Sequence, residues 1–136
     1  MNVLVGATVW SAALRRKSGP PEPCVAELTA LIGEGRVVML GAIRQEILSG
    51  VKLKEQFREL RNRLRAFEDL DLDTVDYENA AACYNECRGK GVQGSSADLL
   101  LCAVSLRRDL PIFSDDGDFD HYSKAIGVKL HRSRAV

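Results

Sequence analysis

The sequence has no long apolar run and no excess of charge of either sign. Its 136 residues carry 19 Lys and Arg against 19 Asp and Glu. The apolar start, MNVLV, is followed by Ser11, Arg15, Arg16 and Lys17, too early for the core of a signal peptide. No stretch approaches the length that spans a membrane. We therefore expect a cytoplasmic protein that does not enter a membrane.

Cysteine is also scarce, with Cys24, Cys83, Cys87 and Cys102 as its four occurrences. Nothing indicates secretion, and a chain of this length builds a core without disulfides, so we expect reduced thiols. Cys83 and Cys87 stand four apart on a predicted helix, but no second Cys or His pair has the spacing of a zinc site. We interpret both as small buried apolar residues.

The composition that is present, 46% hydrophobic and 28% charged residues, predicts one globular domain over residues 1–136. Short apolar segments alternate with segments of helical periodicity, which predicts an α/β fold with a parallel sheet. The predicted strands are 2–5, 36–40, 70–75, 111–113 and 128–130. The predicted helices are 8–14 with Thr8 as its cap, 25–32, 41–48, 52–67, 77–88, 95–106 and 119–126.

Carboxylates gather after the predicted strands. Asp116 and Asp118 follow strand 111–113, and Glu46 lies early in the helix after strand 36–40. Asp98 occupies the third position of a helix that Ser95 would cap. Each has an ordinary explanation as a surface residue, turn residue or helix cap. Because the carboxyl ends of parallel strands share one edge of a sheet, we expect all four acids to meet there. Like charges repel, so such a site favours a cation.

A basic segment follows the second predicted strand. Residues 52–68 contain the cations Lys52, Lys54, Arg58, Arg61, Arg63 and Arg65. Phe57, Leu60, Leu64 and Phe67 recur at helical spacing and predict a core-facing stripe. The basic face is either an ordinary solvated helix surface or a nucleic-acid footprint, and the sequence leaves both interpretations open.

The order of the motifs resembles the PIN-domain family, and most closely its VapC-like toxin branch. The likeness rests on the opening strand that runs into Val9-Trp10, on GAIRQEILSG at 41–50, on GSSADLLLCAVSLRRDLPIFSDDGDF at 94–119, and on a closing strand. It implies a three-layer α/β/α sandwich with a central, mostly parallel sheet. It further implies a ribonuclease that depends on Mg²⁺ or Mn²⁺, pairs with an antitoxin protein and forms a homodimer.

The resemblance also implies roles for individual residues. Glu46, Asp98, Asp116 and Asp118 match family acids, with the last three expected to hold the metal and Glu46 to bind a metal-bound water or a second ion. Thr8 and Ser114 would orient a water or a phosphate. The RNA backbone would contact the basic helix through Lys52, Lys54, Arg58, Arg61 and Arg65, with an affinity that falls as salt rises.

One family acid is missing. The family usually has V-D-T-S-V-W at the end of its first strand, whereas this chain has Val5-Gly6-Ala7-Thr8-Val9-Trp10. Magnesium needs only one or two protein carboxylates, but a lost positioning group costs orders of magnitude in rate. We therefore expect weak or absent cleavage, and the alternative is an inactive PIN-fold module that binds RNA or an antitoxin.

Overall fold

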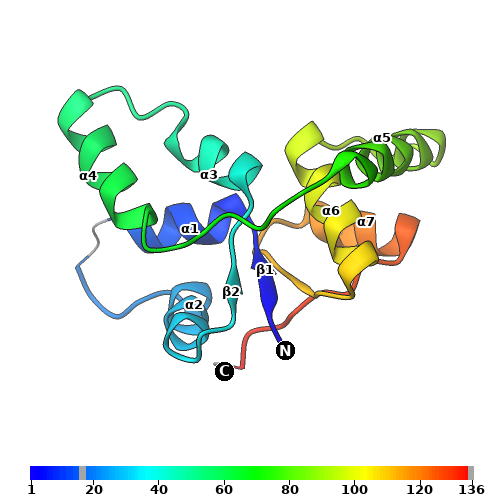
Figure 1. Ribbon diagram of the computed structural model, residues 1–136. Helices are drawn as coiled ribbons and strands as arrows, with labels where there is room; N and C mark the ends of the chain where they lie inside the picture. Colours follow the sequence, from blue (N-terminus) through cyan, green and yellow to red (C-terminus); the bar gives the residue numbers. More distant parts are fainter. Residues whose placement is uncertain (16–17, 135–136) are drawn as a thin grey trace.

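The computed structural model describes residues 1–15 and 18–134, which form seven helices and three strands (Figure 1). In chain order the elements are β1 Val3–Val5, α1 Ala7–Leu14, α2 Pro23–Gly33, β2 Val37–Val38, α3 Gly41–Leu48, α4 Lys54–Leu64, α5 Thr74–Gly89, α6 Ser96–Arg108, β3 Ile112–Phe113 and α7 Asp118–Ile126. The predicted α/β fold is confirmed, with three of the five predicted strands present in the described residues.

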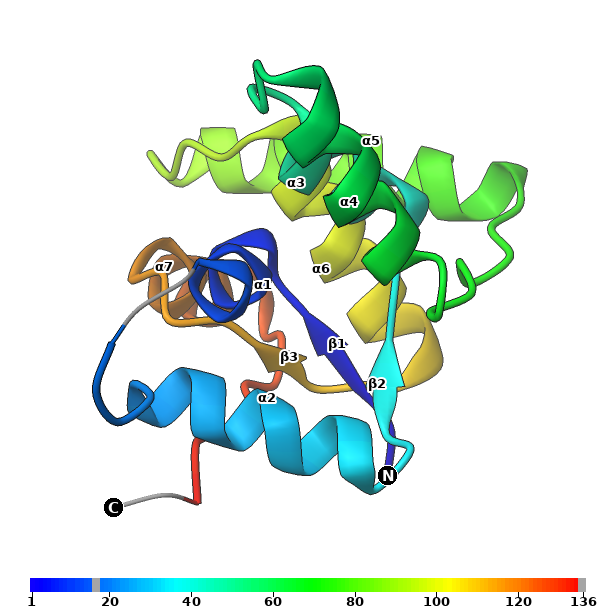
Figure 2. The same ribbon diagram turned by 90° about the vertical axis from the view of Figure 1, so that its left-hand side faces the viewer.

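The strands form a parallel sheet in the order β2-β1-β3 (Figure 2). Val3 pairs with Val37, and Val5 pairs with Phe113. The central strand β1 is buried along its whole length, which explains its continuous apolar sequence. Because the strands are parallel, the ends of β1 and β3 at Val5 and Phe113 lie at the same edge of the sheet.

The sheet lies between two groups of helices. Helices α1 to α4 cover one side and α5 to α7 the other, which confirms the α/β/α arrangement (Figure 1). Helix α6 supplies much of the core, since Leu101, Cys102 and Val104 are fully buried. The N-terminal turn of this helix also carries Asp98, so the core fixes one of the candidate acids.

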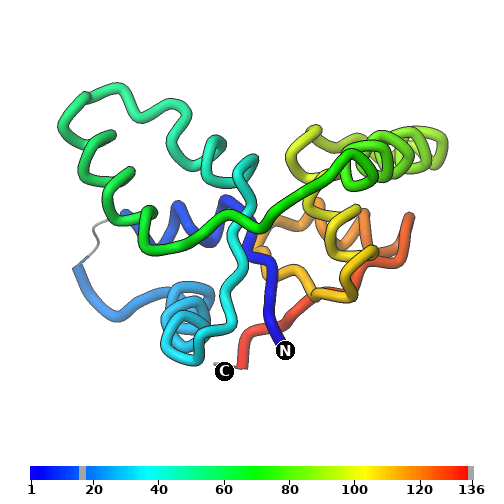
Figure 3. The backbone as a smooth tube through the Cα atoms, in the orientation of Figure 1, coloured from blue at the N-terminus to red at the C-terminus, as the bar shows by residue number. Residues whose placement is uncertain are grey.

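The predicted strand 70–75 is wrong. The chain there makes one parallel bridge, Met39 with Asp69, and then crosses from α4 to α5, as the tube in Figure 3 shows. Helix α5 begins instead at Thr74, because Asp73 and Asp76 form a capping box in which each side chain accepts the other's backbone N–H. This start signal was present in the sequence as Asp73-Thr74-Val75-Asp76.

Three smaller predictions also need correction. Strand 128–130 is reduced to a bridge between Ile112 and Leu130. Helix α1 has Gly6 as its N-cap, so Thr8 is not the cap. In the stripe of α4, Leu64 is buried, but Phe57 is exposed because it lies on the outer, basic side of the helix.

All four cysteines are free thiols, as expected. Cys87 and Cys102 are buried and Cys83 is half-buried, and burial raises the pKa of each of these thiols. In the described segments, no helix is both long and apolar enough to cross a membrane.

A buried acid joins α5 to α6. Asp76 is completely buried and forms ion pairs with Arg107 at 3.0 Å and Arg108 at 2.9 Å. Asp73, which is more exposed, pairs with Arg107 at 2.7 Å. The Arg107 hydrogen bond lowers the pKa of Asp73 to about 2. Burial opposes ionisation of Asp76, but the Asp73 backbone and both arginines outweigh it, so its pKa is also lowered.

These depressed pKa values predict a loss of stability in acid. A lowered carboxyl pKa stabilises the fold above the unfolded value of about 3.9, and this contribution is lost as the pH falls through the folded value. We therefore expect the free energy of unfolding to fall from about pH 4 toward pH 2, and to fall less steeply in Asp73→Asn. Urea unfolding at a series of pH values measures this slope. Asp71→Asn, whose exposed side chain lies outside the network, is the control and should keep the wild-type slope.

Candidate functional site

Four acidic side chains come from three separate parts of the fold and interact with one another. We call Glu46, Asp98, Asp116 and Asp118 the acidic cluster. Glu46 is on α3, Asp98 is in the first turn of α6, and Asp116 and Asp118 follow β3. Asp98 and Asp116 are half-buried, and Glu46 and Asp118 are more exposed. The fold therefore brings together acids that lie up to 72 positions apart in the sequence, from 46 to 118.

Local hydrogen bonds fix the loop after β3. The Asp116 N–H donates to Ser114 Oγ at 3.1 Å, and the Asp118 N–H donates to Asp116 Oδ1 at 3.0 Å. These bonds turn the chain directly into α7, which begins at Asp118. Carboxylates in the first turn of a helix are stabilised by the positive end of its dipole. The S-D-D-G-D sequence therefore forms a hydrogen-bonded turn that holds Asp116 and Asp118 in fixed positions.

Asp98 is held by groups on both sides. Its backbone N–H donates to the N-cap Ser95 Oγ at 3.1 Å, as the sequence predicted. One carboxylate oxygen, Oδ2, accepts a hydrogen bond from the Tyr122 hydroxyl at 2.9 Å. Tyr122 belongs to α7 and is fully buried. Asp98 thus joins the start of α6 to the helix that follows the aspartate loop.

The electrostatics of the acidic cluster show that its members share one region. Burial, then the charges of Asp98 and Asp116, raise the pKa of Glu46. Burial also raises the pKa of Asp98, and Asp116 and Asp118 raise it further, against the lowering effect of the Tyr122 hydrogen bond. Across residues 1–15 and 18–134, no Lys, Arg or His forms an ion pair with these four acids. The cluster has uncompensated negative charge, which an added cation would relieve.

Gly6 lies at the edge of the sheet where the family's first acid would stand. It is buried, and its N–H donates to the Phe113 carbonyl at 2.9 Å. Its φ of −75° and ψ of 160° suit any residue. A Cβ at this position would lie 3.3 Å from both Cβ and Oγ of Ser114. The position accepts a side chain if Ser114 shifts by a few tenths of an ångström.

The two predicted hydroxyl residues are neighbours. Thr8 Oγ1 lies 3.5 Å from Ser114 Oγ and donates to Asp115 Oδ1 at 2.6 Å. Asp115 also accepts a long contact from the Cys24 thiol at 3.7 Å. Thr8 is therefore tied to the loop that carries Asp116, while its oxygen lone pairs can still accept a hydrogen bond.

The donor set suits a hard cation held by few protein ligands. No three His, Cys, Asp or Glu side chains in the described segments are arranged to hold one metal ion together. Carboxylate oxygens are nevertheless the ligands that Mg²⁺ prefers, and Mg²⁺ commonly takes one or two of them, with water and phosphate oxygens completing its coordination. The residues present fit that pattern and do not form a closed, all-protein cage.

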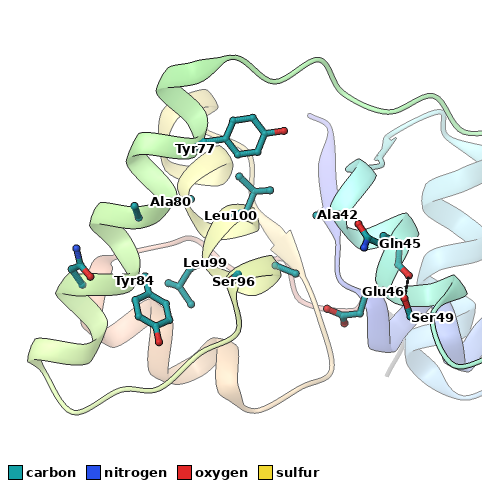
Figure 4. Close-up of a pocket in the computed structure, with 13 residues that line it drawn as sticks. Ala42, Gln45, Glu46, Ser49, Tyr77, Ala80, Tyr84, Ser96, Leu99 and Leu100 are labelled. Atoms are coloured by element: carbon teal, nitrogen blue, oxygen red, sulfur yellow. Dashed lines mark hydrogen bonds between the residues drawn. The ribbon is translucent and has the colours of Figure 1, made fainter.

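A groove of about 690 Å³ opens beside Glu46 (Figure 4). Residues of α3, including Gln45 and Glu46, form one wall, and α5 and α6 form the other. On α5, Tyr77 and Tyr84 line the groove with exposed rings. These tyrosines lie seven positions apart on α5, a spacing that sequence reasoning did not single out.

The basic residues of α4 lie apart from the acidic cluster. Lys52, Lys54, Arg58 and Arg61 line a hollow of about 320 Å³ together with Phe57. Arg65 is the C-cap of α4. The structure therefore places the predicted RNA-binding cations on a surface separate from the groove beside Glu46.

Sequence reasoning missed two residues beside the acids. Tyr122 follows Phe119 by three positions on α7, and this spacing indicates only a core-facing pair, which the edge-to-face contact of their rings at 5.0 Å confirms. Gly94 precedes the Ser95 cap and packs against the Tyr122 ring, where an added Cβ would lie 2.7 Å from the hydroxyl oxygen. No local sequence pattern predicts either contact, because both depend on how α6 and α7 pack.

The α/β/α fold is shared with solved structures. FitAcB from Neisseria gonorrhoeae matches with a TM-score of 0.74 and 21% identity over 98% of this chain and 99% of that one. VapBC2 from Rickettsia felis, bound to a promoter DNA fragment, matches with a TM-score of 0.75 and 16% identity over 96% of this chain and 98% of that one. FitAB bound to the IR36 DNA fragment matches with a TM-score of 0.72 and 21% identity over 95% of this chain and 93% of that one.

The model of the PIN domain family matches residues 3–125. The chain belongs to the PIN domain family, as the motif order indicated. No curated protein matches it significantly.

Proposed function

We propose that this protein is a metal-dependent endoribonuclease of the VapC toxin type, with cleavage weakened by Gly6. Membership of the PIN family supports a nuclease role in general. The observation that carries the finer proposal is the acidic cluster, in which burial and then neighbouring acids raise the pKa values of Glu46 and Asp98, with no basic ion-pair partner among the described residues. Such a cluster is suited to a divalent cation and a phosphate ester.

In this proposal Asp98, Asp116 and Asp118 would hold the metal, one or two of them directly and the rest through bound water, because no three acids in the described segments are arranged to hold one ion together. A bound Mg²⁺ or Mn²⁺ would acidify water and neutralise charge on the phosphate. Glu46, which also lines the groove of Figure 4, would accept a proton from the attacking water. Its raised pKa brings it closer to neutral pH than an ordinary glutamate, which favours such proton transfer. Thr8 and Ser114, 3.5 Å apart, would hold a water or phosphate oxygen.

The proposed partners are RNA, an antitoxin protein and a second copy of the chain. RNA would reach the site across the basic α4 face, whose Lys52, Lys54, Arg58, Arg61 and Arg65 attract phosphates. The neighbour VapBC2, which has the same fold, supports an antitoxin partner. The groove of Figure 4, with exposed Tyr77 and Tyr84, offers an apolar surface for a protein contact such as the homodimer.

A second candidate function is an inactive PIN-fold module that binds RNA or an antitoxin. Gly6 favours it, because this position has no carboxylate and Ser114 lies close to the space that one would fill. In this case the acidic cluster serves as a binding surface for positive groups.

Cleavage of a labelled single-stranded RNA pool with Mg²⁺ or Mn²⁺ separates the two functions. We expect slow cleavage that EDTA abolishes and that Asp116→Asn reduces at least tenfold, because one of the few metal ligands is lost. Asp120→Asn is the matched control. It removes a carboxylate four positions further along, in the first turn of α7, where Asp120 pairs with Arg132 at 3.1 Å, outside the cluster.

Equal cleavage by the wild-type protein and Asp116→Asn would contradict the proposed site. RNA binding without any cleavage would instead support the inactive module.

A further inference from the structure

The Tyr122 hydroxyl contacts the acidic cluster from inside the core. Its Oη lies 2.9 Å from Asp98 Oδ2, while the ring is fully buried on α7. A buried phenol needs a hydrogen-bond partner, and Asp98 is the one that this structure gives it. A residue of the core therefore donates a hydrogen bond to one carboxylate oxygen of the acidic cluster.

Two packing features hold the phenol in this place. Phe119 contacts the Tyr122 ring edge to face, with centroids 5.0 Å apart. On another side Gly94 leaves room that a Cβ would take, since the added atom would lie 2.9 Å from Cε1 and 2.7 Å from Oη. The ring therefore cannot move far, and the direction of its hydroxyl is set by the fold.

We infer that Tyr122 is a positioning residue that fixes the rotation of the Asp98 carboxylate for a divalent cation. A hydrogen bond to Oδ2 resists rotation of the carboxylate, and the Ser95 side chain also hydrogen-bonds to Asp98, so we take Oδ1 as the oxygen that would face the metal. Hydrogen bonds from groups behind a metal ligand orient that ligand, and their loss typically weakens metal binding 10- to 100-fold. The inference rests on the proposed function in so far as Asp98 is taken as a metal ligand.

The position of Tyr122 also couples two parts of the site. Asp116 and Asp118 precede or begin α7, and Tyr122 lies one turn further along the same helix. Its hydroxyl bonds to Asp98 on α6. A shift of α7 would therefore move both the aspartate loop and the hydroxyl that orients Asp98. This link keeps the relative positions of Asp98, Asp116 and Asp118 coupled.

Mn²⁺ titration by calorimetry tests the inference in Tyr122→Phe, which keeps the ring and removes only the hydroxyl. We expect about tenfold weaker Mn²⁺ binding than in the wild-type protein, with the fold retained as judged by thermal unfolding. Ser123→Ala is the matched control. It also removes a hydroxyl of α7, but one that donates to the Val128 carbonyl at 2.8 Å, away from the acids. In an Asp98→Asn background, Tyr122→Phe should have no further effect on Mn²⁺ affinity.

A second readout needs no metal. The intensity ratio of the tyrosine Raman doublet reports whether a phenol donates a hydrogen bond to a negative acceptor. The difference between wild-type and Tyr122→Phe spectra isolates the Tyr122 doublet, whose intensity ratio should be that of a phenol donating a strong hydrogen bond. This ratio should change in Asp98→Asn. Absence of the donor signal, or unchanged Mn²⁺ affinity in Tyr122→Phe, would overturn the inference. If the wild-type protein binds no Mn²⁺, the proposed function fails, and the Raman signal alone decides whether Tyr122 fixes Asp98.

Discussion

Gly6→Asp is expected to raise metal-dependent RNA cleavage by roughly 100-fold or more, because it adds a carboxylate at the edge where β1 and β3 end. The gain would come from fixing the cation against the scissile phosphate, which is a matter of position and charge. The backbone does not resist the change, since φ is −75° and ψ is 160°. Asp is also a favourable N-cap for α1.

The new side chain has to share space with Ser114, whose Cβ and Oγ would lie 3.3 Å from the added Cβ. It also adds a fifth negative charge beside the acidic cluster. We therefore expect Gly6→Asp to be less stable than the wild-type protein in EDTA and to gain more stability from Mn²⁺. Thermal unfolding with and without the metal measures both effects.

Two controls isolate the carboxylate. Gly6→Ala carries the Cβ alone, and Gly6→Asn carries a side chain of the same shape without the charge. Initial rates on labelled RNA should rise in Gly6→Asp and in neither control. Equal metal-dependent rates for wild-type and Gly6→Asp would show that Gly6 does not limit the reaction. Inactivity of both would favour the binding module.

Gly94→Ala should lower the free energy of unfolding by about 1–3 kcal/mol, the usual cost of overpacking a filled core. The added Cβ would lie 2.4 Å from Leu99 Cδ2 and 2.7 Å from Tyr122 Oη. Leu99 is buried and Tyr122 is held by Phe119, so neither side chain has room to withdraw. The same displacement would move the hydroxyl away from Asp98 and weaken Mn²⁺ binding.

Gly89→Ala is the matched control for this substitution. Gly89 is the last residue of α5, and a Cβ there would have no neighbour within 4 Å. Because Ala restricts the unfolded chain more than Gly, this variant should be as stable as the wild-type protein or more stable. Urea unfolding compares the two variants, and a Gly94→Ala protein of wild-type stability would contradict the close packing around Tyr122.

The sequence allowed most of the fold to be predicted because its apolar strands are short and two of them, β1 and β3, are buried along their whole length. Val3–Val5 cannot form a helix of useful length, and its parallel pairing follows from the helices on either side. The position of the acids followed from the same rule, since strand ends determine where loops meet. The error at 70–75 came from giving the apolar alternation of Leu70 and Leu72 more weight than the capping box that begins at Asp73.

The remaining features of the site depend on tertiary contacts. Tyr122 and Asp98 are 24 positions apart, and Thr8 and Asp115 are 107 apart, so no local pattern links them. The effect of Asp98 on the pKa of Glu46 likewise exists only once α3 and α6 pack near each other. The sequence therefore predicted which acids would meet, whereas the groups that orient them emerged only from the packing of α6 and α7.

Anomalous diffraction from crystals soaked in Mn²⁺ tests the central claim most directly, namely that the acidic cluster takes a divalent cation. We predict a manganese peak in contact with carboxylate oxygens of Asp98 and Asp116, and its loss in Asp116→Asn. A wild-type crystal with no manganese at the cluster, under conditions where Mn²⁺ occupies other surface carboxylates, would contradict the account.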